Sequence, residues 1–481
     1  SSTFGPADRR HNFFKLSAAW EFSKLYAPSF LNFGKLRLAY GQAGEEPNVY
    51  AIYSGYTSPS LFSVGGKASL GLNYRGVTGY RSDDQVSNFR IRPERRHEYE
   101  IGGDLSLFDG SMGVSTTIYN AINKDVIYDI DVIPSTGADE MTANGASIQN
   151  KGLELTIDYR VLDRERLKWE SKFIYASNKN TVLEMNGVDG EMAKLMDPNL
   201  VPSRGIAKFS EVSPGHEYAE FKVLSWSRFG HGLIIDHDLD INTPDVNIDT
   251  LSGYSWNKND VYVAKNGLPL MYSEKIWSGY APNPAWTGSF YNELKIGNKL
   301  QLSCLLDISM GGHIANYTKN ALYEWGTHGE TENRYHPDFD NEDWYGYEEG
   351  VSTDWGKGKF QDLLNHGHRA IGPGQDSVIT FSQNLYENYM GRNTDVINNI
   401  EDASYIKLRE LALSYNFGAV SLGHLGDPNV TIRLSAQDLK TWTNYTGWDP
   451  ETNMYQDRIS GEDYFNQPQT WRANMAVQFN W

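Results

Sequence analysis

The residues best suited to binding chemistry form an aromatic and acidic group in the second half of the chain. Trp and Tyr rings stack on sugar rings, and carboxylates accept hydrogen bonds from hydroxyl groups. We therefore predict a substrate-binding loop that contains Trp325, Asp338, Asp340, Asp343, Trp344, Tyr345, Tyr347 and Trp355. The same composition suits a loop that packs on its own aromatic residues or on a partner protein. Both interpretations stay open at this point.

A second acidic stretch has the spacing of a calcium loop, with carboxylates at Asp236, Asp238, Asp240, Asp245 and Asp249. An EF-hand loop requires a glycine and a bidentate glutamate at fixed later positions. Ile241 and Asn247 stand at those two positions. We interpret the stretch as a solvated acidic loop and expect no cofactor, with a calcium site as the alternative.

Paired carboxylates also catalyse glycoside hydrolysis, for which two carboxyl groups must lie about 5 to 9.5 Å apart in a cleft. An acidic loop supplies such pairs by chance. The sequence contains no nucleophile elbow, no phosphate-binding glycine loop and no histidine-rich metal pattern. We therefore expect no catalytic residues and no enzymatic activity.

Composition narrows the class of protein further. The net charge of −18 argues against a nucleic-acid partner, which requires a basic face. Aromatic residues make up 13 % of the chain, an excess that fits interfacial girdles or a sugar-binding surface. Mean hydropathy is −0.54, and no apolar run is long enough for a transmembrane helix. A transmembrane barrel is still compatible with these values, because only alternate residues of its strands meet lipid.

The elements that must position these loops are strands, and the last eleven residues show the pattern most clearly. Apolar side chains at Ala473, Met475, Val477, Phe479 and Trp481 alternate with mostly polar ones. Successive strand residues point to opposite faces, so this segment predicts a ribbon with one apolar face. Eleven residues tilted by about 45° climb roughly 25 Å, which matches the apolar band of an outer-membrane barrel. A terminal strand of a soluble β-sandwich would show the same alternation.

The same two-residue period recurs along the whole chain, and several repeats are joined as hairpins. One pair of strands flanks the Asp109-Gly110 turn, and another flanks a turn at Gly297-Asn298. The single cysteine, Cys304, lies on the apolar phase of its strand, where we interpret it as a small hydrophobic residue. About twelve to fourteen strands are expected, with no convincing long helix, so the chain is assigned to the all-β class.

The connections between these strands are of two lengths. Some are two to six residues long, whereas four long polar stretches cover residues 44–96, 180–284, 312–402 and 440–470. Short turns at one end and long loops at the other are typical of an outer-membrane barrel, whose long loops are extracellular. The residues alone therefore favour a transmembrane antiparallel β-barrel with long extracellular loops.

Seven phrases, in order along nearly the whole chain, resemble the C-terminal half of SusC-like (SusC/RagA) TonB-dependent transporters of Bacteroidota outer membranes. They are residues 35–44 (KLRLAYGQAG), 92–95 (RPER) with 98–102 (EYEIG), 119–120 (YN) with 124–128 (KDVIY), 150–155 (NKGLEL), 283–290 (NPAWTGSF), 401–410 (EDASYIKLRE), and 438–439 (DL) with 441–443 (TWT). A final strand that ends on Phe479 and Trp481 also resembles the C-terminal signal of outer-membrane barrels.

The resemblance implies that residues 1–481 are the C-terminal portion of a 22-stranded barrel in the Gram-negative outer membrane. The plug domain, signal sequence and TonB box would belong to an N-terminal part outside this chain. The implied function is TonB-dependent import of a nutrient, an oligosaccharide in the first place or else a peptide. The implied partners are a SusD-like surface lipoprotein, the TonB-ExbB-ExbD complex acting through the N-terminal part, and membrane lipid. The alternative is a secreted or surface β-protein that binds polysaccharide without transporting it.

Overall fold

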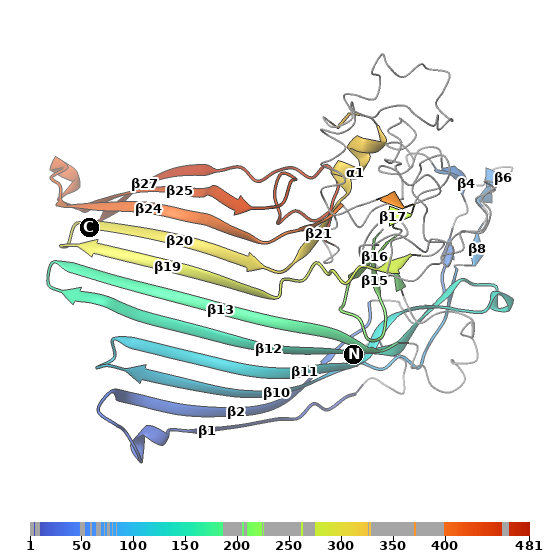
Figure 1. Ribbon diagram of the computed structural model, residues 1–481, viewed down its shortest axis with the longest axis horizontal. Helices are drawn as coiled ribbons and strands as arrows, with labels where there is room; N and C mark the ends of the chain where they lie inside the picture. Colours follow the sequence, from blue (N-terminus) through green and yellow to red (C-terminus); the bar gives the residue numbers. More distant parts are fainter. Residues whose placement is uncertain are drawn as a thin grey trace.

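The longest strands among the described residues form one antiparallel sheet, which we call the wall (Figure 1). The computed structural model describes residues 4, 10–48, 53–57, 60–63, 69–71, 73–74, 77–78, 80–82, 84–185, 204–205, 209–223, 225, 261–262, 275–325, 327–328, 370–371, 399–454 and 461–481. The wall strands, in spatial order, are β1 (Lys15–Trp20), β2 (Leu31–Glu45), β10 (Glu94–Leu107), β11 (Met112–Asp131), β12 (Glu140–Arg164), β13 (Leu167–Glu184), β19 (Trp286–Ile296), β20 (Leu300–Met310), β24 (Tyr405–Ala419), β25 (Asn429–Thr443) and β27 (Arg472–Asn480).

The register of the wall confirms that each strand has an apolar and a polar face. Leu38, Ile101, Ile118 and Leu153 lie directly opposite one another on four neighbouring strands. The adjacent row is polar and contains Glu100 opposite Tyr119. Because the side-chain period is two, a one-residue slip of any strand would exchange the two faces. The terminal strand follows the same rule, with Met475 opposite Leu434 and Val477 opposite Ile432.

Short turns join the wall strands at one end, at the left of Figure 1. The Asp109-Gly110 turn forms as the sequence indicates, with φ of +56° and +74° at these two residues. Glycine adopts such a left-handed conformation without steric cost, which explains its place there. Two of the other short turns contain 3-10 helices, η1 (Phe22–Lys24) and η8 (Gly423–Leu425).

The opposite end of the wall carries the long connections. Their described elements are β3 (Tyr56–Thr57), β4 (Ser60–Ser63), β5 (Ser69–Gly71), β6 (Asn73–Tyr74), β7 (Val77–Thr78), β8 (Arg81–Ser82), β9 (Gln85–Val86), η2 (Pro134–Thr136), β14 (Arg204–Gly205), β15 (Ser210–Val212), β16 (Glu220–Val223), β17 (Val261–Tyr262), β18 (Ile276–Trp277), β21 (His313–Asn316), α1 (Tyr317–Glu324), β22 (Ala370–Ile371), β23 (Ile400–Asp402) and β26 (Glu462–Asp463). Among the described residues, no helix is long and apolar enough to cross a membrane.

The buried hydrophobic residues lie mainly at this second end. The β11–β12 hairpin projects beyond its neighbours, since β12 has 25 residues and β19 has 11. Ile130, Val132, Met141 and Ala143 form a buried cluster on the projecting part. The wall is therefore a single layer, and the buried hydrophobic clusters lie mainly in the connections at this end.

Candidate functional site

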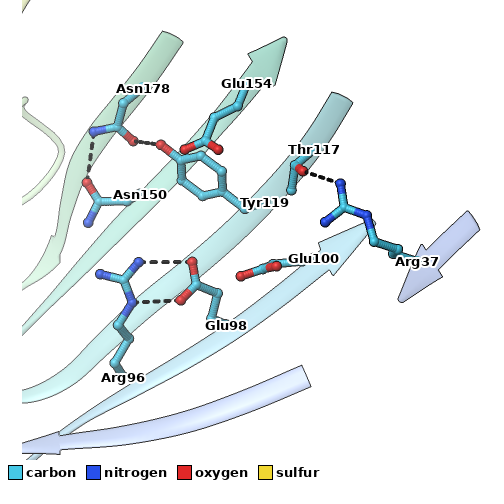
Figure 2. A pocket seen from close by; sticks show the side chains of 9 residues that line it. All are labelled: Arg37, Arg96, Glu98, Glu100, Thr117, Tyr119, Asn150, Glu154 and Asn178. Carbon is cyan, nitrogen blue, oxygen red and sulfur yellow. Dashed lines mark hydrogen bonds and ion pairs between the residues drawn. The ribbon is translucent and has the colours of Figure 1, made fainter. Parts of the chain in front are cut away.

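The polar face of the wall carries a pocket of about 430 Å³ over strands β2 to β13 (Figure 2). It is lined by Arg37, Arg96, Glu98, Glu100, Thr117, Tyr119, Asn150, Glu154 and Asn178. All nine residues belong to wall strands, so the pocket is a property of the sheet and not of a loop. None of the nine was predicted as a site residue, although several fall within the phrases of the family resemblance.

A glycine lets one lining side chain cross a whole strand. Arg37 on β2 lies directly opposite Gly102 on β10, and a Cβ at Gly102 would come within 2.9 Å of the guanidinium. Because no Cβ is present, Arg37 reaches over β10 and donates to Thr117 on β11 at 3.2 Å. Its Nε also lies 3.0 Å from the Asp104 carboxylate.

The same device recurs two strands further on. The ring of Tyr119 on β11 lies over Gly152 on β12, where a Cβ would come within 2.4 Å of the ring. The phenol thereby reaches Asn178 on β13 and donates to its side-chain oxygen at 3.1 Å, as Figure 2 shows. Asn178 in turn donates to Asn150 at 3.1 Å. Two side chains thus tie together strands that are not neighbours, and they fix the shape of the pocket.

The charges in this pocket are only partly paired. Arg96 forms a bidentate contact with Glu98 at 3.0 and 2.9 Å. In the described part of the chain, the carboxylates of Glu100 and Glu154 form no ion pair. The described residues also contain no group of His, Cys, Asp and Glu side chains that could hold a metal ion. The pocket can therefore offer hydrogen bonds and charge to a polar ligand.

A second cavity, of about 920 Å³, lies on the same face between the later wall strands and the β25–β27 connection. We call residues 444–471 the strap; the structure describes 444–454 and 461–471 of it. The strap contributes Gln467, Pro468, Gln469 and Thr470 to the lining. The wall contributes charged residues, among them Asp307, Arg409 and Asp438.

The wall is irregular beside this cavity. The β20–β24 register shifts between Leu305 and Leu306, and the β24–β25 register shifts between Leu408 and Glu410. Arg409 is the residue skipped in both ladders, and Asp438 opposite has a φ of +54°. Bulges re-aim side chains, and left-handed backbone at a residue other than glycine costs roughly 1 kcal/mol or more. Here the irregularity turns Arg409 toward Asp307 at 3.0 Å and Asp438 at 3.1 Å.

The re-aimed arginine also fastens the strap to the wall. Glu451 of the strap accepts hydrogen bonds from Arg409 and from Lys407, which is fully buried. Tyr405 donates to the same carboxylate at 2.6 Å, and Lys407 also lies 3.3 Å from Asp449. Burial alone raises the pKa of Glu451, but the hydrogen bonds from Arg409, Lys407 and Tyr405 outweigh it and lower the pKa to about 2. Glu451 is therefore ionised at neutral pH and binds this end of the strap through charge-assisted hydrogen bonds.

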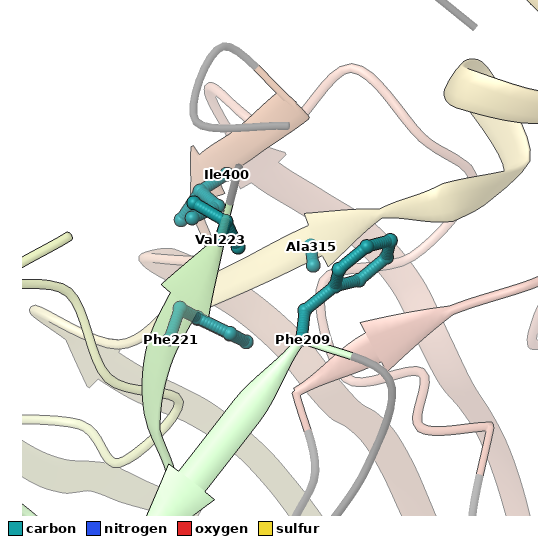
Figure 3. Close-up of a cluster of buried hydrophobic side chains, with 5 residues drawn as sticks. All are labelled: Phe209, Phe221, Val223, Ala315 and Ile400. Atoms are coloured by element: carbon teal, nitrogen blue, oxygen red, sulfur yellow. The ribbon is translucent and has the colours of Figure 1, made fainter. Parts of the chain in front are cut away.

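Beyond the wall, two of the long connections share one hydrophobic core. We call residues 209–223, 276–285, 311–325 and 399–404 the cap. Figure 3 shows its central cluster, in which residues from the β13–β19 and β20–β24 connections meet. The members are Phe209, Phe221, Val223, Ala315 and Ile400. The described parts of these connections therefore pack together as a folded unit.

Buried carboxylates hold the strap in the cap. Glu462 is fully buried and accepts the backbone N–H of Phe209 at 2.8 Å. Asp463 accepts a hydrogen bond from the Tyr445 hydroxyl at 2.6 Å and another from Thr318 at 3.2 Å. Burial and these acidic neighbours, Asp463 first among them, raise the pKa of Tyr445. The strap is thus bound to the wall through Glu451 and to the cap through Glu462 and Asp463.

One of the predicted substrate-binding residues can be placed. Trp325 directly follows α1, is 56 % exposed, and stacks on Phe465 of the strap with ring centroids 5.4 Å apart and planes 8° apart. The other predicted residues, Asp338, Asp340, Asp343, Trp344, Tyr345, Tyr347 and Trp355, lie outside the described residues. The acidic stretch around Asp236 and Asp240 lies outside them too.

The C-terminal pair, Phe479 and Trp481, lies on the apolar face with ring centroids 5.9 Å apart. Sequence reasoning missed Arg409, Lys407 and Glu451. A signal existed in the two cations on alternate positions of the quoted 401–410 phrase. Their carboxylate partner could not be identified, because Arg409 and Glu451 are 42 residues apart and meet through the bulge.

Comparison with known proteins agrees with this geometry. Residues 1–293 match the family described as "TonB dependent receptor-like, beta-barrel". TonB-dependent receptor P3 of Formosa agariphila is 23 % identical over 99 % of this chain and 42 % of its own length. TonB-dependent receptor P39 of the same organism is 24 % identical over 94 % of this chain and 41 % of its own. The chain therefore spans about two fifths of these curated relatives.

The fold resembles that of the RagAB peptide transporter, with a TM-score of 0.65 at 14 % identity over 99 % of this chain and 44 % of that one. These matches confirm the expected barrel fold and the expected SusC-like resemblance. They are to receptors and a transporter, which also confirms that the chain is not an enzyme. The chain belongs to the TonB-dependent receptor β-barrel family.

Proposed function

We propose that this chain lines the import path of a nutrient across the bacterial outer membrane, driven by TonB. The observation that carries the proposal is the two-faced wall. One face is mainly apolar along the strands, and the other holds two cavities with polar lining, of about 430 and 920 Å³. A wall with an apolar outer and a polar inner face is the arrangement by which barrels enclose a polar path in lipid.

We propose further that the chain is the C-terminal portion of a closed, 22-stranded barrel with its plug domain in another part of the protein. In the described part of the chain, β1 pairs with β2 alone and β27 with β25 alone. A strand edge left unpaired in hydrocarbon costs several kcal/mol for each unsatisfied backbone group. Additional strands of the barrel would remove both edges.

The proposed cargo is an oligosaccharide, with a peptide as the alternative. Exposed Trp325, already stacked on one side, offers its other face to a ring of the cargo. The remaining predicted loop residues, Asp338 to Trp355, stay part of this proposal. A SusD-like lipoprotein at the cap end is the proposed partner, and its support is the family resemblance. The peptide alternative draws on the similarity to the RagAB peptide transporter.

The test is growth and uptake in the organism that carries the gene. A deletion strain is complemented with wild type or with Trp325→Ala, and each strain receives either an oligosaccharide pool or a tryptic peptide pool as sole carbon source. We expect the deletion to abolish growth on one pool and a protonophore to stop uptake of that pool. Equal growth of deletion and wild-type strains on both pools would contradict the proposal.

A further inference from the structure

The short-turn end of the wall carries a concentration of positive charge that the transport path does not use. Residues 163–168 and 295–299 contain five cationic and two anionic side chains, although the whole chain has a net charge of −18. The two turns lie side by side, because the Gly297 N–H donates to the Arg166 carbonyl at 2.8 Å. The two segments therefore form one surface.

Three of these cations have no carboxylate partner within the described residues. Lys168 pairs with Asp163 at 3.4 Å, and Lys295 pairs with Glu293. The three cations without a carboxylate partner in the described part of the chain are Arg164, Arg166 and Lys299, and all three are exposed. We call these three residues the basic patch.

A β-bulge places the first cation on the apolar face. Before the bulge between Arg160 and Leu162, odd-numbered residues of β12 such as Tyr159 lie on that face. After the bulge the phase reverses, so that Leu162 lies opposite Trp169 and Arg164 lies opposite Leu167. Arg164 therefore sits beside the last apolar row of the wall, at its edge.

An aromatic residue marks the same level of the wall. Trp169 is 38 % exposed, and its indole N–H donates to Asn292 at 3.1 Å. Ile296, 43 % exposed, belongs to the row next to the turns. Tryptophan is enriched where a barrel passes from hydrocarbon to headgroups, because its ring is apolar and its N–H is polar. The basic patch thus lies at headgroup level, directly outside exposed apolar side chains.

We propose that the basic patch, with Trp169 and Ile296, is a binding site for an anionic phospholipid of the leaflet that borders the short turns. Guanidinium groups match the geometry of a phosphate, and clustered Lys and Arg side chains next to an apolar surface attract anionic headgroups. Continuity with the apolar face favours a lipid over an acidic protein, since a lipid occupies both surfaces at once. The acyl chains lie along the rows that contain Trp169 and Ile296, and the phosphate lies among the three cations.

The test uses the complete protein extracted from outer membranes in nonionic detergent. Native mass spectrometry compares the retention of phosphatidylglycerol with that of phosphatidylcholine of the same acyl chains. We expect the wild-type protein to prefer phosphatidylglycerol at least tenfold. The triple variant Arg164→Gln, Arg166→Gln, Lys299→Gln should reduce this preference to within about twofold.

A matched control removes the same charge elsewhere. Arg92, Lys172 and Arg433 are each paired with a carboxylate, and their replacement by Gln should leave the preference unchanged. Heat-dependent mobility in electrophoresis checks that both variants keep the barrel fold. If the triple variant does not keep it, the single variant Arg164→Gln replaces it in the comparison. A triple variant that keeps its preference overturns the lipid site and leaves the patch to an acidic protein. Equal loss in the control overturns it as well, because net charge would then explain the effect.

Discussion

The wall and the cap are stabilised in opposite ways. The wall buries few of its apolar side chains, and Leu38 on its apolar face is 54 % exposed. Its order comes from ladder hydrogen bonds and from regular register. The cap has a hydrophobic core, and its Phe221 is fully buried. The wall therefore needs an apolar environment such as lipid to cover its exposed face, whereas the cap is stabilised by its own hydrophobic core.

The largest expected effect separates the two regions directly. Phe221→Ala leaves a cavity in the cluster of Figure 3, and truncation of a buried Phe costs about 3–5 kcal/mol. We expect the free energy of local opening in residues 209–223 to fall by that amount, so that amide hydrogen exchange there becomes faster. Exchange in β10 and β11 should stay unchanged. Leu38→Ala is the control, and an equal effect of both variants on the cap would remove the distinction.

The next effect concerns the connection between the two regions. Arg409→Met leaves Asp307, Asp438 and Glu451 without their shared cation, and loss of one partner of this half-buried ionic group costs about 2 kcal/mol. We expect faster hydrogen exchange of strap residues 444–454 while the cap core stays protected. Arg433→Met removes an exposed pair with Glu410 and should cost less than about 1 kcal/mol. A strap that stays equally protected in Arg409→Met would mean that the cap alone holds it.

The same fastening should depend on pH in a definite direction. The pKa of Glu451 is lowered from 4.5 to about 2, so its contribution is fully present above pH 4.5 and is lost as the pH falls toward 2. After allowance for partial solvent exposure, the contribution is about 2 kcal/mol. Strap exchange measured between pH 6 and pH 3 should show this loss in the wild-type protein. In Glu451→Gln the strap should be weakly held at every pH, and a wild-type profile in that variant would exclude Glu451 as the titrating group.

Within the wall, the two glycine crossings predict a smaller effect. A Cβ at Gly152 would meet the Ser177 carbonyl at 2.3 Å and the Tyr119 ring at 2.4 Å, so Gly152→Ala should cost about 1–3 kcal/mol by overpacking. Gly41→Ala is the matched control, because no atom lies within 4 Å of its added Cβ. Urea midpoints of the detergent-extracted protein measure both. Equal midpoints would show that Tyr119 moves aside without cost.

The smallest expected effect on stability is at the exposed aromatic pair. Trp325→Ala removes the stack on Phe465, and such pairs contribute about 0.5–1.5 kcal/mol. We expect the cap to stay folded, by hydrogen exchange, while cargo uptake decreases. Uptake at the wild-type rate would mean that Trp325 does not contact the cargo and that another part of the cap does.

The sequence by itself determined the wall. Alternation such as Ala473 to Trp481 has a period of two, and this period is local, so it could be recognised strand by strand. The Asp109-Gly110 turn was equally predictable, since its left-handed backbone favours Gly. Short hairpin turns also predicted which strands pair on either side of them, whereas the neighbours joined by the four long connections became known from the structure.

Only the tertiary structure decided the site. The backbone N–H of Phe209 donates to Glu462, which lies 253 residues further along the chain, and no local period encodes that contact. The bulge at Arg409 is a departure from alternation, so the rule that predicted the strands could not predict it. Gly102 and Gly152 stand in the quoted phrases 98–102 and 150–155, but their role depends on Arg37 and Tyr119, whose side chains cross them in the folded sheet. Local periodicity fixes which face a side chain takes, whereas partners across the sheet and between loops depend on where distant segments come to lie.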